Sequence, residues 1–88
     1  MMATFAEVLW HDAHADTTTW MEKDEISEQP CVVVSCGILL PDAKPNHVVL
    51  VQSLNSYEQV DCVLSIPVAM VQSMRVLGSG LDAVEHLG

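Results

Sequence analysis

The feature that most constrains this chain is a pair of apolar segments in its last third, joined through a proline. Residues 60–66 read as a β-strand, and Pro67 follows directly. After one tight turn, residues 71–77 form a second short apolar segment. Alternation with a period of two is typical of half-buried strands, and proline starts turns because its φ is fixed. The pattern predicts two consecutive strands at the last corner of a small β-barrel.

Three further segments have strand character. They span residues 5–11, 31–40 and 47–54. Gly37 interrupts the second of them, which indicates a bulge or a sharp bend, and a positive φ there would mark the bend. We therefore expect a mainly β protein, a small five-stranded and strongly bent antiparallel barrel.

The length of 88 residues suits one domain with one core. We expect residues 1–77 to form the barrel domain. Residues 12–30 are a long polar loop after the first strand, with Trp20 among its few large apolar side chains. Residues 78–88 begin with Gly-Ser-Gly, a flexible joint, and then favour a short C-terminal helix or a frayed tail.

The second and third strand segments are apolar on both faces. Val32 and Val34 alternate with further apolar residues, and residues 48–51 are all apolar. An antiparallel sheet with one solvated face has one polar face. One face must therefore fill the barrel while the long loop, the C-terminal segment or another subunit covers the other. Of these, we favour a homo-oligomer.

The charge excludes several functions. Twelve Asp and Glu residues oppose three Lys and Arg residues, for a formal net charge of −9. General DNA or RNA binding and binding to anionic membranes need a basic face, which Lys23, Lys44 and Arg75 cannot supply. A cationic protein partner, or mimicry of nucleic acid, fits the charge better. Neither a secretion signal nor a membrane-spanning segment is visible, so we expect a cytoplasmic protein.

The cysteines do not indicate catalysis. Cys31, Cys36 and Cys62 lie in apolar segments without a C-x-x-C motif, which predicts buried free thiols. Burial in apolar surroundings disfavours a reactive thiolate. No nucleophile elbow and no phosphate-binding glycine loop occurs. We expect no enzyme activity, no catalytic residue and no cofactor.

Residues 11–16 read His-Asp-Ala-His-Ala-Asp and superficially resemble a metal site. Two imidazoles and two carboxylates suit zinc or manganese. On a strand, however, His11 and His14 point to opposite faces. A solvated strand end is the better interpretation of these residues and of Asp16, so we expect no metal.

The order of several motifs resembles known proteins. Residues 37–40, 48–51 and 64–67, followed by Val71 and Met74, are similar to the bent and closing strands of Sm-like or SH3-like small barrels. A wider set of motifs, which covers most of residues 5–77, resembles small uncharacterised bacteriophage proteins: Trp10-x-Asp12, Trp20, Ser35-x-Gly37, Gln52-Ser53, Ile66-Pro67 and Val71-x-Ser73. The resemblance implies a small barrel, a viral origin and the cytoplasm of a bacterial host. Basic residues of the kind that hold RNA in Sm proteins are lacking near the loops.

A ligand site is the remaining prediction. Tryptophan stacks on bases and anchors interfaces, neutral side chains donate hydrogen bonds, and a guanidinium binds phosphate. A simpler interpretation, that both tryptophans belong to the core and that Arg75 is merely exposed on the last strand, has more weight than the ligand site. The candidate ligand-binding residues are Trp10, Asp12, Trp20, Ser35, Gln52, Ser53 and Arg75.

Three functions follow from these observations. The first is a non-enzymatic phage protein that sequesters a cyclic nucleotide or a related signalling nucleotide used in bacterial immunity. The second is an acidic inhibitor that binds a host nucleic-acid-binding protein. The third is a structural or assembly component of a virion. The sequence slightly favours the first.

Overall fold

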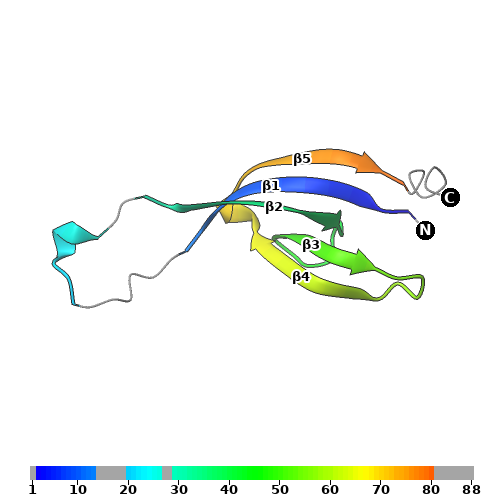
Figure 1. Ribbon diagram of the computed structural model, residues 1–88, viewed down its shortest axis with the longest axis horizontal. Coiled ribbons are helices and arrows are strands. Elements are labelled where there is room, and N and C mark those ends of the chain that lie inside the picture. Colours follow the sequence, from blue (N-terminus) through cyan, green and yellow to red (C-terminus); the bar gives the residue numbers. More distant parts are fainter. Residues whose placement is uncertain (1, 14–19, 27–28, 81–88) are drawn as a thin grey trace.

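The computed structural model describes residues 2–13, 20–26 and 29–80, and it contains one five-stranded antiparallel sheet (Figure 1). The elements in chain order are β1 (Thr4–Asp12), η1 (Lys23–Glu25), β2 (Cys31–Leu39), β3 (His47–Leu54), β4 (Val60–Pro67), η2 (Val68–Met70) and β5 (Val71–Ser79), where η denotes a 3₁₀ turn. The mainly β class and the five strands are confirmed, with strand ends within two residues of the predicted ones.

The strands lie in the order β4-β3-β2-β1-β5. The first four form a meander, and β5 returns to pair with β1 in antiparallel register, Glu7 opposite Arg75. Pro67 ends β4, and η2 turns the chain into β5. The backbone N–H of Val68 donates to the carbonyl oxygen of Asn46 at 3.0 Å, which ties this turn to the start of β3. The turn predicted after Pro67 is therefore present.

The predicted barrel is wrong, because the sheet is neither closed nor strongly curled. Its edges, β4 and β5, lie at opposite ends of the strand order. In addition, β2 and β3 pair only through Ile38 with Val51 and Leu39 with Leu50. A barrel needs a ladder of hydrogen bonds that continues around its whole circumference. Here β3 and β4 diverge from the other three strands instead (Figure 1).

Gly37 allows β2 to approach β3 closely. A Cβ atom at this position would lie 3.0 Å from the carbonyl oxygen of Val51 and 3.3 Å from the Cβ of Leu50. The positive-φ glycines in the described part of the chain are Gly78 and Gly80, so the positive φ expected at Gly37 is wrong. The glycine is needed for space between strands rather than for an unusual backbone conformation.

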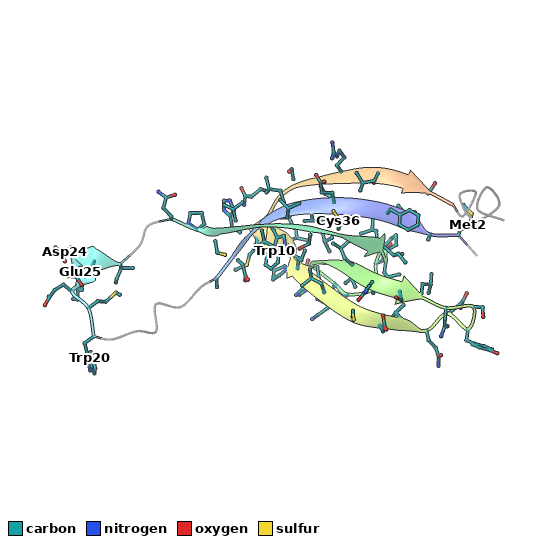
Figure 2. The ribbon with its side chains drawn as sticks, in the orientation of Figure 1. Met2, Trp10, Trp20, Asp24, Glu25 and Cys36 are labelled. Carbon is teal, nitrogen blue, oxygen red and sulfur yellow. The ribbon has the colours of Figure 1, made fainter. Side chains whose placement is uncertain are left out.

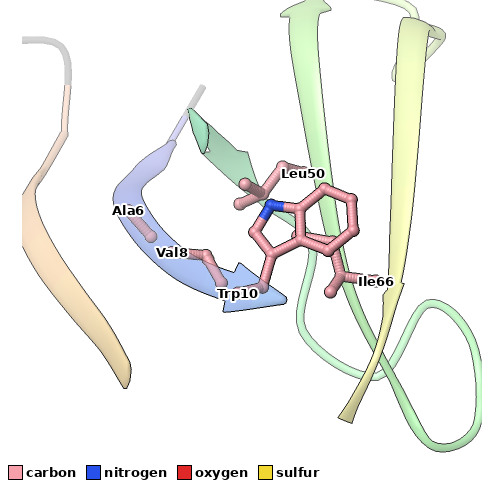
Figure 3. Packing of buried hydrophobic residues seen from close by; sticks show 5 residues of the cluster. All are labelled: Ala6, Val8, Trp10, Leu50 and Ile66. Carbon is pink, nitrogen blue, oxygen red and sulfur yellow. The ribbon is translucent and has the colours of Figure 1, made fainter. Parts of the chain in front are cut away.

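The core lies on one face of the sheet and joins its two diverging parts. Ala6, Val8 and Trp10 alternate along β1, and all three are buried. They form one cluster with Leu50 of β3 and Ile66 of β4. Figure 3 shows the indole of Trp10 between β1 and the β3–β4 hairpin. Apolar burial thus holds the two parts together where β2 and β3 share few hydrogen bonds.

Two segments extend from this core. The turn η1 and its neighbours, residues 20–26, lie at one end of a molecule that measures 58 × 23 × 22 Å (Figure 1). At the other end, β5 runs to Ser79, and the backbone N–H of Gly80 donates to the carbonyl oxygen of Ala3 at 2.8 Å. The predicted C-terminal helix or tail falls on residues 81–88, which lie outside the described residues. Within the described ranges, no helix has the length and apolarity needed to cross a membrane.

Candidate functional site

Trp10 is a core residue whose indole N–H makes a hydrogen bond. Its side chain is 8% exposed, and its Nε1–H donates a hydrogen bond to Ser35 Oγ at 3.0 Å. Ser35 lies opposite Val8 in the β1–β2 register, so it shares the core face with Trp10. The indole ring is packed against Leu50 and Ile66 and offers no free face for a base.

A hollow opens beside this pair, where β2 separates from the β3–β4 hairpin. Its volume is about 450 Å³, which lies within the range of about 300–1,000 Å³ usual for small-molecule sites. Ser35 and Gln52 are the predicted site residues that line it. The lining is neutral and consists of Ser35, Cys36, Gly37, Leu50, Val51, Gln52, Cys62 and Leu64.

The other predicted site residues do not converge on this hollow. Trp20 is 99% exposed and lies beyond the end of the sheet (Figure 2). Asp12 is exposed at the end of β1, and Ser53 is exposed on β3. Arg75 lies on β5, where its Nη2 is 3.2 Å from Glu7 Oε2. The structure therefore brings together Trp10, Ser35 and Gln52 and leaves the other four apart.

The exposure of the three cysteine thiols contradicts a second prediction. Cys31, Cys36 and Cys62 are free and exposed, so the prediction of buried thiols is wrong. Cys36 shares a face of β2 with Val32 and Val34, and nothing in the described residues covers that face. Val32 and Val34 on the same strand are 58% and 60% exposed. Cys31 is the first residue of β2, and Cys62 lies on the edge strand β4. The apolar residues on both faces of β2 predict that its outer face is covered. The described residues provide no such cover, so the side chains on that face are exposed.

Exposed carboxylates gather in two places on the surface, apart from single acids at Asp12 and Asp42. Glu58 and Asp61 lie around the β3–β4 connection, and Glu22, Asp24 and Glu25 lie at and within η1. There the backbone N–H of Glu22 donates to Glu25 Oε2 at 3.3 Å as part of a capping box. This bond orders the turn and fixes the exposed acids around it.

A metal centre is not formed by the described residues, which contain no group of three or more His, Cys, Asp or Glu side chains placed to hold an ion. His11 lies at the end of β1. His14 and Asp16, the other residues of the superficial metal motif, lie outside the described residues.

The hollow is the feature that the sequence analysis missed. Its sequence signal is Ser35-x-Gly37, because residues i and i+2 of a strand share a face, and a small side chain followed by a glycine there leaves space. The comparisons with known proteins add no assignment, since no family model, no curated protein and no solved structure matches the chain.

Proposed function

We propose that this chain is a non-enzymatic domain that binds another protein through its acidic surface. The observation that carries the proposal is the placement of charge. The formal net charge is −9, and no charged side chain is buried among the described residues. Arg75, the cation on the sheet, is paired with Glu7. The carboxylates are therefore available to a partner, with little competition from cations of the same chain.

The partner that fits this surface is a basic protein, such as one that binds nucleic acid. Complementary potentials steer two proteins together and exclude partners of the wrong charge. A protein that occupies a basic groove competes with nucleic acid for it and thereby inhibits the partner. Exposed Trp20, beside the acids of η1, supplies an aromatic side chain of the kind that anchors interfaces.

Affinity capture with charge-neutralised variants tests the proposal. One variant removes the acids of η1 (Glu22→Gln, Asp24→Asn and Glu25→Gln), and a matched variant removes those of the β3–β4 connection (Glu58→Gln and Asp61→Asn). Both sites are exposed, and glutamine and asparagine keep a side-chain oxygen that can accept the same hydrogen bonds, so we expect both variants to keep the fold. We expect a basic protein to be captured from host lysate at low salt, and one variant to lose it while the other retains it. Capture that neither variant reduces would contradict the proposal.

Nucleotide sequestration is a second candidate, and the hollow favours it. Ser35 and Gln52 offer neutral hydrogen-bonding groups in a space of suitable size. The phosphates would need a cation from elsewhere, since the lining has none. Native mass spectrometry with cyclic nucleotides and NAD-derived signalling molecules tests it. A retained molecule that Gln52→Ala releases would support this candidate, and a panel without any retained molecule would remove it.

A further inference from the structure

We draw no further inference here: the strongest candidate, the exposed apolar face of β2 that carries Val32, Val34 and Cys36, supports no proposal because nothing in the described part of the structure shows what covers it.

Discussion

The Nε1–H of Trp10 on β1 donates a hydrogen bond to Ser35 Oγ on β2, at 3.0 Å. This bond satisfies the one polar atom of a side chain whose ring fills the core. It also lies beside the hollow, whose wall includes Ser35. Trp10 therefore belongs to the core of the sheet, and its partner Ser35 belongs to the wall of the hollow.

Ser35→Ala should lower the free energy of unfolding by about 1–3 kcal/mol, because it leaves the indole N–H of Trp10 without its partner. Urea denaturation measures the change. Ser73→Ala is the matched control, since Ser73 is exposed on β5, and it should change the stability little. Equal effects of the two substitutions would show that the bond does not stabilise the fold.

Gly37→Ala should destabilise the protein by about 1–3 kcal/mol, because the new Cβ would lie 3.0 Å from the carbonyl oxygen of Val51. Gly37→Val should cost more, since its larger side chain meets the same strand. Thermal or urea unfolding provides both values. A neutral Gly37→Ala would mean that β3 moves away from β2 without loss.

All three cysteine thiols should react quickly with an aromatic disulfide reagent in the folded protein, because each is free and exposed. The absorbance of the released thiolate gives the count and the rates. Denatured protein supplies the reference for full reactivity. Slow modification that needs unfolding would contradict the exposure of the thiols, and at Cys36 it would contradict the open outer face of β2.

The Glu7–Arg75 ion pair should add little stability. Its side chains are 34% and 70% exposed, and exposed pairs contribute about 0.2–1 kcal/mol. A double-mutant cycle with Glu7→Gln and Arg75→Gln measures the coupling energy, which should shrink as salt is raised. Coupling well above this range, and insensitive to salt, would indicate a pair shielded from water.

Strand positions could be predicted from this sequence because local signals decide them. The alternation of Ala6, Val8 and Trp10 marks the buried face of β1, and Pro67 marks the corner before β5. Closure of the sheet could not be predicted, since it depends on contacts between distant residues. Gly37 illustrates the difference: its position in a strand is local information, whereas its approach to Val51 is not.

The candidate site was predictable in part for the same reason. Ser35 and Gln52, two of the seven predicted ligand-binding residues, line one hollow. Trp10 and Trp20 have opposite environments, one buried in the core and one fully exposed. The local sequence places Trp10 in an alternating strand and Trp20 in a long polar loop, but it does not show whether that loop packs on the sheet, which decides the exposure of Trp20.

We propose that the chain binds a basic protein through its exposed carboxylates. The most direct measurement is the affinity of the purified chain for the captured partner as salt is raised, with the variant that loses capture as the control. We expect an affinity that falls steeply with salt and a variant that binds weakly at every salt concentration. An affinity that stays constant from low to high salt would contradict it.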